Sequence, residues 1–225
     1  PEGGSTFYHN RTMILDGHTG VEHNIPVAPV YKDIVKLWSQ SKTGYTPTLI
    51  VNYGGLNAEF YWYQNTNVYE NKKLLQFYPR QIIASRARHR MMIPQEEYDN
   101  GHILVSQTCK KLSDAGVKVN LGAHGQLQGL GAHWELWSLQ QGGMTNMEAL
   151  RCATINGADY IGMSKDIGSL KEGKLADLII MDKNPLDNIQ NSNTIIYTMI
   201  NGRLYDTETM NEVGNEPKTR KKFYW

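Results

Sequence analysis

The sequence has little of what marks many functional classes. Its 225 residues hold two cysteines, Cys109 and Cys152, in no metal-binding or redox motif. Each lies in a helix-like segment that contains apolar residues, so both are expected to be buried free thiols. No apolar run approaches the roughly 20 residues of a membrane-spanning helix, so no membrane partner is expected. The formal net charge of +1 likewise gives no reason to expect nucleic acid.

Motifs of several enzyme classes are also missing. The chain has no Gly-x-Ser-x-Gly nucleophile motif, no phosphate-binding loop and no dinucleotide fingerprint. The first five residues, Pro-Glu-Gly-Gly-Ser, resemble neither a translation start nor a signal peptide, and no signal segment is recognisable. We expect them to lie inside a longer polypeptide.

Strand-like and helix-like segments alternate through most of the chain. Strands are predicted at 12–15, 21–23, 46–51 and 117–121, and helices at 30–40, 95–115, 133–141 and from Thr145, whose spacing to Glu148 predicts a capping box. This alternation is typical of βα units around a parallel sheet. The long segment 52–94 is rich in Tyr, Trp, Asn and Arg and is predicted to be an elaborated active-site loop.

The last third of the chain has a different pattern. Short apolar runs at 178–180 and 195–200 are followed by Asn201-Gly202, a strong hairpin signal. These runs predict a small antiparallel β unit appended to the βα part.

Histidines follow two of the predicted parallel strands. His23 comes after Val21-Glu22, and His124 comes after 117–121 between glycines. In a barrel, the loops after the strands build the functional site. Neutral imidazole is a good ligand for Zn²⁺ and similar ions, so both are candidate metal ligands, against the alternative of hydrogen-bonded structural histidines.

Further candidates lie near these histidines in the sequence. His133 and Glu135 stand at a predicted helix start, where they would take part in catalysis or orient substrate; packing of His133 on a tryptophan is the alternative. Tyr53 and Trp62, with the neighbouring tyrosines, are candidate substrate contacts, and packing aromatics are the equal alternative. Gln126 is a further candidate substrate contact.

Several stretches together resemble the amidohydrolase superfamily, especially its imidazolonepropionase- and prolidase-like branch. The segment GGMTNMEALRCAT at 142–154, with 157–158 and 168–179, resembles the last barrel helix and the strand that returns to the small β-sandwich. The stretches at 1–4, 16–20, 122–126 and 133–137 resemble exported bacterial amidohydrolases that carry an N-terminal Tol-type β-propeller. This resemblance implies a periplasmic or secreted protein.

The resemblance implies an α/β fold: the C-terminal part, about strands 5/6 to 8, of a TIM-type (β/α)8 metallo-hydrolase barrel, plus strands of the small composite β-sandwich. The implied units are 1–165 for the half barrel, 166–212 for the sandwich strands and 213–225 for a C-terminal tail. His23 then matches the metal-ligating histidine of strand six, and Glu2 is the nearest candidate for the strand-five ligand. His124 occupies the strand-eight position, where the family usually has an aspartate, and is expected to be a ligand or a proton shuttle.

The resemblance therefore predicts a zinc-dependent hydrolase of C–N bonds in a small-molecule or peptide-like substrate. The alternative is a non-catalytic ligand-binding or scaffold module that has lost the strand-eight aspartate. The expected partner is the N-terminal remainder of the barrel, in the same precursor or another chain, with homo-oligomerisation left open. The chain alone is expected to be inactive, because an open half barrel exposes unpaired strand edges.

Overall fold

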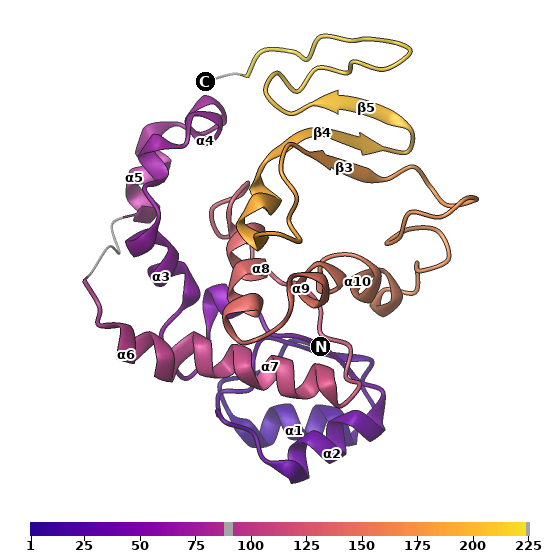
Figure 1. Ribbon diagram of the computed structural model, residues 1–225. Coiled ribbons are helices and arrows are strands. Elements are labelled where there is room, and N and C mark those ends of the chain that lie inside the picture. The colour runs from indigo at the N-terminus through magenta and orange to yellow at the C-terminus, as the bar shows by residue number, and fades with distance from the viewer. Residues whose placement is uncertain (88–91, 224–225) are drawn as a thin grey trace.

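The computed structural model describes residues 1–87 and 92–223. It has two parts, a short parallel sheet surrounded by helices and a three-stranded antiparallel unit (Figure 1). Residues 88–91 of the predicted loop 52–94 and the last two residues of the predicted tail lie outside the described residues. In the described ranges, no helix is both long and apolar enough to cross a membrane.

Helices make up most of the first part. They are α1 (Phe7–Leu15), α2 (Lys32–Ser41), α3 (Ala58–Asn65), α4 (Lys72–Phe77), α5 (Arg80–Ala87), α6 (Gln95–Tyr98), α7 (Leu104–Asp114), α8 (Gly131–Gln141), α9 (Asn146–Cys152) and α10 (Ile155–Tyr160). A π-helical turn at Asp99–Ile103 joins α6 to α7, and 3-10 turns lie at Leu49–Val51, Val68–Glu70 and Ile189–Asn193. The capping box predicted at Thr145 and Glu148 is present at the start of α9.

The parallel sheet is built from β1 (Gly20–Glu22) and β2 (Gly44–Thr46), paired from Gly20↔Gly44 onward. Single parallel bridges extend it on both sides, Glu2 beside Glu22 and Val119 beside Tyr45. Four chain segments thus lie side by side and run in the same direction. The predicted parallel arrangement is confirmed over these residues, and closure into a barrel stays a prediction.

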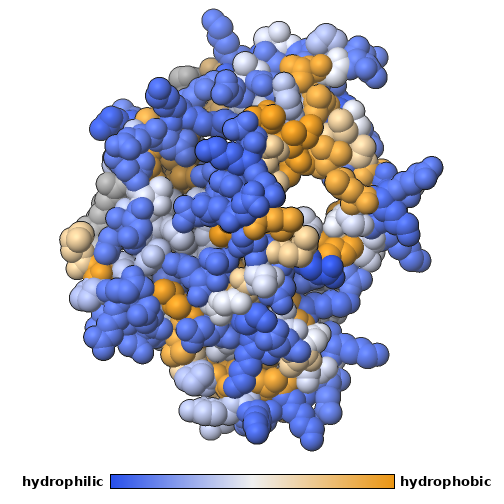
Figure 2. Space-filling model, viewed as in Figure 1, coloured by the Kyte–Doolittle hydropathy of each residue, from blue (hydrophilic) through white to orange (hydrophobic). Residues whose placement is uncertain are grey.

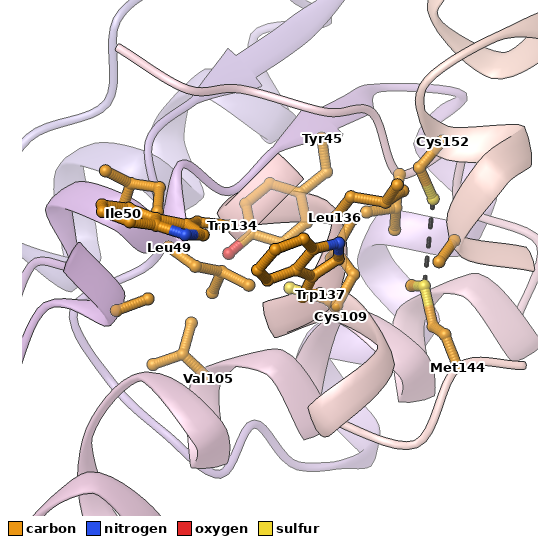
Figure 3. Close-up of a cluster of buried hydrophobic side chains, with 14 of the residues drawn as sticks. Tyr45, Leu49, Ile50, Val105, Cys109, Trp134, Leu136, Trp137, Met144 and Cys152 are labelled. Atoms are coloured by element: carbon orange, nitrogen blue, oxygen red, sulfur yellow. Dashed lines mark hydrogen bonds between the residues drawn. The ribbon is translucent and has the colours of Figure 1, made fainter. Parts of the chain in front are cut away.

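Apolar side chains from the sheet and from the helices behind it form the core. Tyr45 of β2 is 1% exposed and packs against the Trp38 ring of α2, with ring centroids 4.6 Å apart. Leu49 and Ile50, in the 3-10 turn after β2, are fully buried beside the tryptophans of α8 (Figure 3). This packing fixes where β2 ends and where the following chain turns.

Three predicted strands take another form. Residues 12–15 belong to α1, because the short apolar stretch is the end of a helix that begins at Phe7. The apolar run 46–51 leaves the sheet after Thr46, since Thr48 adopts a left-handed backbone (φ 54°) and Leu49–Val51 coils into a 3-10 turn. Residues 117–121 contribute a single bridge at Val119 rather than a full strand.

The segment 52–94, predicted as a loop, contains α3, α4 and α5, which extend along one side of the molecule toward the β unit (Figure 1). Its aromatic residues account for this: Trp62 and Tyr63 of α3 are buried against α8. Trp62 and Tyr63 thus anchor α3 on α8, as the packing alternative expected.

The antiparallel unit consists of β3 (Leu178–Met181), β4 (Ile195–Ile200) and β5 (Arg203–Asp206), in the order β3-β4-β5. The predicted hairpin is present, with Asn201 and Gly202 at φ 48° and 78°, the two positive values of a type I′ turn. One face of the unit is apolar and open to solvent, with Ile200 58% exposed. Figure 2 shows this apolar patch beside a hollow that separates the unit from the helices below it.

Candidate functional site

A pocket of about 420 Å³ lies at the carboxyl end of the parallel segments. Every one of the four segments contributes to it, because parallel strands deliver their ends to the same edge of a sheet. Its lining residues are Glu2, Glu22, His23, Thr46, Thr48, Leu121, Gly122 and His124. The three residues predicted as metal ligands, Glu2, His23 and His124, are all among them.

His23 is the most constrained of the three. Its side chain is buried, and its Nε2 lies 3.8 Å from a carboxylate oxygen of Glu2. The Tyr53 ring stacks on the imidazole, with centroids 4.7 Å apart and planes at 20°. The buried Nδ1 has no hydrogen-bond partner among the described residues. Burial, and then the neighbouring His124, lower the pKa of His23, which keeps the ring neutral and able to donate a lone pair.

His124 meets His23 edge to face, with ring centroids 5.1 Å apart. Its side chain is exposed toward the pocket, whereas that of His23 is enclosed. His23, Thr48 and His124 follow three neighbouring segments, and each has a positive φ, of 67°, 54° and 50°. Such a backbone is unfavourable for residues with a Cβ, above all for a β-branched threonine, and clusters at functional sites.

Glu22 lines this pocket and Tyr160 contacts Glu22, although no sequence motif marked either residue. The Tyr160 hydroxyl at the end of α10 donates a hydrogen bond to Glu22 Oε1, and burial followed by this carboxylate raises the pKa of the Tyr160 hydroxyl. The ring fits because two paired strand positions lack side chains. A Cβ at Gly20 would lie 1.8 Å from the Tyr160 hydroxyl, and one at Gly44 would lie 2.6 Å from the ring. The paired glycines were the available clue.

The pocket is lined by residue types that bind divalent metals in other proteins. Two imidazoles and a carboxylate are the kinds of ligand that catalytic zinc sites use, and Nε2 is the nitrogen of His23 that faces Glu2. Within residues 1–87 and 92–223, no group of three or more His, Cys, Asp or Glu side chains is placed closely enough to hold a metal ion. The role of Glu2, His23 and His124 as metal ligands therefore stays a prediction.

His133 and Glu135 lie outside this pocket. His133 Nδ1 is 3.0 Å from Ser192 Oγ, so the histidine joins α8 to the chain that precedes β4. Glu135 is fully buried, and its two oxygens accept hydrogen bonds from the backbone N–H groups of Leu49 and Ile50 at 2.8 and 2.9 Å. Burial raises the pKa of Glu135 to about 8. Both residues hold elements together, and their predicted catalytic roles stay predictions.

Of the three predicted substrate contacts, one lies beside the pocket and two have structural contacts elsewhere. Tyr53 stacks on His23 beside the pocket. Trp62 is buried, and its Nε1 donates to Ser138 Oγ of α8 at 2.8 Å. Gln126 Oε1 accepts from Arg86 Nη1 at 3.2 Å, which ties the chain after His124 to α5. Of the three, only Tyr53 touches a residue of the candidate metal site.

Comparisons with known proteins agree with this fold. Residues 96–205 match the model of the amidohydrolase family. A 5′-deoxyadenosine deaminase from Methanobrevibacter smithii is 43% identical over 68 residues, 28% of this chain and 15% of that protein. An imidazolonepropionase from Symbiobacterium thermophilum is 54% identical over 39 residues, 17% of this chain and 9% of that protein.

A solved structure extends the similarity to most of the chain. A Xaa-Pro dipeptidase with bound methionine in its active site has a TM-score of 0.59 at 20% identity, covering 89% of this chain and 43% of that one. These matches relate the chain to the amidohydrolase superfamily, with an α/β fold and relatives that are enzymes. The chain spans less than half the length of the structure and a smaller share of the two sequence relatives.

Proposed function

We propose that the protein hydrolyses a C–N bond, in an amide, a cyclic amide or a peptide-like substrate, by metal-activated water. The observation that carries the proposal is the convergence of Glu2, His23 and His124 on one pocket. They come from three separate segments, and each stands at the edge where barrel enzymes bind substrate. A hydrogen-bonded structural histidine does not require such convergence.

The residues of the pocket have distinct parts in this proposal. His23 and Glu2 would hold a divalent ion, zinc for this donor set, while Tyr53 fixes the plane of the His23 ring by stacking on it. A bound divalent ion lowers the pKa of a coordinated water toward neutrality and polarises a scissile carbonyl. His124, more exposed than His23, serves as a further ligand or moves a proton between the pocket and solvent.

This chain supplies part of the proposed site. Among residues 1–87 and 92–223, the segments at Glu2 and Val119 are the outer members of the parallel sheet, so each leaves one edge for a further strand. An N-terminal remainder of the barrel, in the same precursor or another chain, would occupy those edges and add the missing ligands.

A non-catalytic ligand-binding module is the second candidate. Its support is the strand-eight position, where His124 stands in place of the aspartate of the resembling enzymes. Histidine can bind metal or move a proton, but it cannot accept two hydrogen bonds as a carboxylate does. A protein that binds a metal and a ligand without turnover would fit this substitution.

Metal analysis of the full-length protein tests the proposal. We expect a bound divalent ion in the parent protein, and His23→Ala and His124→Ala are each expected to weaken its binding at least about tenfold. His18→Ala is the matched control, because His18 is exposed and absent from the pocket lining. Absence of a divalent ion from the parent would rule out metal-dependent hydrolysis. Metal that survives both substitutions would rule out the residue assignment and leave the reaction open.

A further inference from the structure

A second hollow, of about 480 Å³, lies where α4 faces the antiparallel unit. It shares no residue with the candidate metal pocket and falls within the size range of small-molecule sites, roughly 300–1,000 Å³. Its walls come from α4, the chain at 128–130 and the region around β5. The lining residues are Asn71, Lys73, Leu74, Phe77, Tyr78, Gln128, Gly129, Leu130, Asn193, Thr207 and Met210.

The chemistry of this lining is mainly apolar with a single charge. Leu74, Phe77, Leu130 and Met210 provide aliphatic and aromatic surface. Among the described residues that line the hollow, Lys73 alone carries a charge. The lining has no carboxylate to neutralise that ammonium group, so the hollow favours an anion at one end and an apolar body in the rest.

Two hydrogen bonds hold the Lys73 ammonium group in place and leave its third N–H group for a ligand. Its Nζ donates to the backbone oxygen of Ile195 at 2.6 Å and to Thr207 Oγ1 at 2.9 Å. An ammonium group has three N–H donors, so a third remains for a ligand. The side chain is half-buried, which excludes much of the water that would otherwise compete for this donor.

Asp206 is the neighbouring acid that could cancel this charge. It lines an adjoining hollow rather than this one, and its Oδ1 accepts hydrogen bonds from the backbone N–H and the hydroxyl of Thr209 at 2.8 and 2.7 Å. These bonds, first the hydroxyl and then the backbone N–H, lower the pKa of Asp206, so it stays ionised while turned toward Thr209. The charge of Lys73 also lowers the pKa of Asp206, but the two side chains form no direct ion pair among the described residues.

The walls of the hollow are tied together from both sides. Gln76 Nε2 of α4 donates to the backbone oxygen of Glu208 at 2.6 Å, beside the Lys73 bonds to Ile195 and Thr207. On the opposite side, the Tyr78 hydroxyl donates to Gln128 Oε1. The hollow is therefore largely preformed, which reduces the ordering that a ligand would have to impose.

We infer that this hollow binds a small monocarboxylate with an aromatic or branched aliphatic body, its carboxylate on Lys73 and its apolar part against Phe77, Leu130 and Met210. The inference does not rest on the proposed metal chemistry, because the two pockets share no residue. The ligand belongs to the chemical class of arylalkanoates and N-acylated apolar amino acids.

Binding of 4-phenylbutyrate and of its neutral counterpart 4-phenylbutanol to the full-length protein tests the inference. The two probes share an apolar body, so their difference reports on the charge. The carboxylate is expected to bind at least about tenfold more tightly, the ratio typical of one charge-assisted hydrogen bond. Methionines labelled with ¹³C at the methyl group locate the probe, since Met210 lines the hollow. Its methyl signal is expected to shift on titration.

Two variants complete the experiment. Lys73→Met is expected to remove the preference for the carboxylate, while Lys72→Met, on the exposed side of the same helix, should retain it. The inference is overturned if 4-phenylbutyrate does not bind the parent, if the alcohol binds equally well, or if the Met210 methyl signal stays unchanged. Because the two probes are compared on the parent protein, a destabilised Lys73→Met would not prevent a decision.

Discussion

Glu135 offers a sharp test of how a buried carboxyl shapes this fold. It is fully buried in α8 and binds the backbone of Leu49 and Ile50, which belong to the 3-10 turn that follows β2. Glu135→Gln keeps the shape of the side chain and removes its ability to ionise. The amide nitrogen of glutamine would meet one of the two backbone N–H groups, which costs about 1–3 kcal/mol at acidic pH.

The sign of the pH effect follows from the direction of the pKa shift. Burial raises the pKa of Glu135 from its ordinary value of 4.5 to about 8 in the folded protein. Between these values the unfolded chain is ionised and the folded protein keeps its proton, so stability falls as pH rises. The whole shift corresponds to roughly 5 kcal/mol, of which about 3–4 kcal/mol is lost between about pH 5 and pH 8.

Buried histidines act in the opposite direction. Burial lowers the pKa values of His102 and His133 from 6.5 to about 4, so the folded protein resists their protonation. Between about pH 4 and pH 6.5 the unfolded chain binds more protons than the folded protein, so the two histidines make stability rise with pH. Only a comparison of the parent with a variant at each pH isolates the contribution of Glu135.

Denaturant unfolding of the full-length parent and of Glu135→Gln, at pH values from about 5 to 8, measures this contribution. The free-energy gap between the two proteins should shift by about 3–4 kcal/mol in favour of the variant as pH rises. Glu97→Gln, on the exposed surface of α6, is the matched control and should follow the parent throughout. A gap that stays constant over this range would refute the argument that burial dominates at Glu135.

Three further substitutions test local packing, each followed by the free energy of unfolding. Gly44→Ala places a Cβ 2.6 Å from the Tyr160 ring and should cost about 1–3 kcal/mol, most of it recovered when Tyr160→Ala is added. Thr145→Ala removes the capping box of α9 and should cost about 1 kcal/mol, whereas no loss would show that the cap is dispensable. Gly202→Ala, at φ 78°, should cost about 1 kcal/mol or more, and a neutral result would contradict the turn geometry.

Strand ends were the part of the site that the sequence could predict. His23 and His124 stand 101 positions apart in the sequence, yet their rings come within 5.1 Å. The prediction required only that parallel strands deliver their ends to one edge. Glu2 was predicted only from the family resemblance. Its β-bridge to Glu22 places it on the adjacent segment.

Other parts of the fold and of the site could not be predicted, because contacts between residues far apart in the sequence determine them. The apolar run 46–51 reads as one strand, but the Glu135 carboxyl binds the backbone of Leu49 and Ile50 from a helix 85 or more positions away. Tyr160 lies 138 positions from Glu22, and only the glycines that make room for its ring hinted at the contact. Local sequence patterns carry no record of such long-range hydrogen bonds.

The left-handed backbone at His23 has a consequence for how such sites are recognised. Along a strand, side chains point alternately to opposite faces, so Glu22 and His23 should face different sides of the sheet. The positive φ of His23 breaks this alternation, and both residues line the same pocket. Glycine would adopt this backbone without strain but would bring no imidazole. Position 23 therefore has an imidazole on a backbone that favours glycine, and a His23→Gly protein that is more stable but binds no metal would support the role proposed for this side chain.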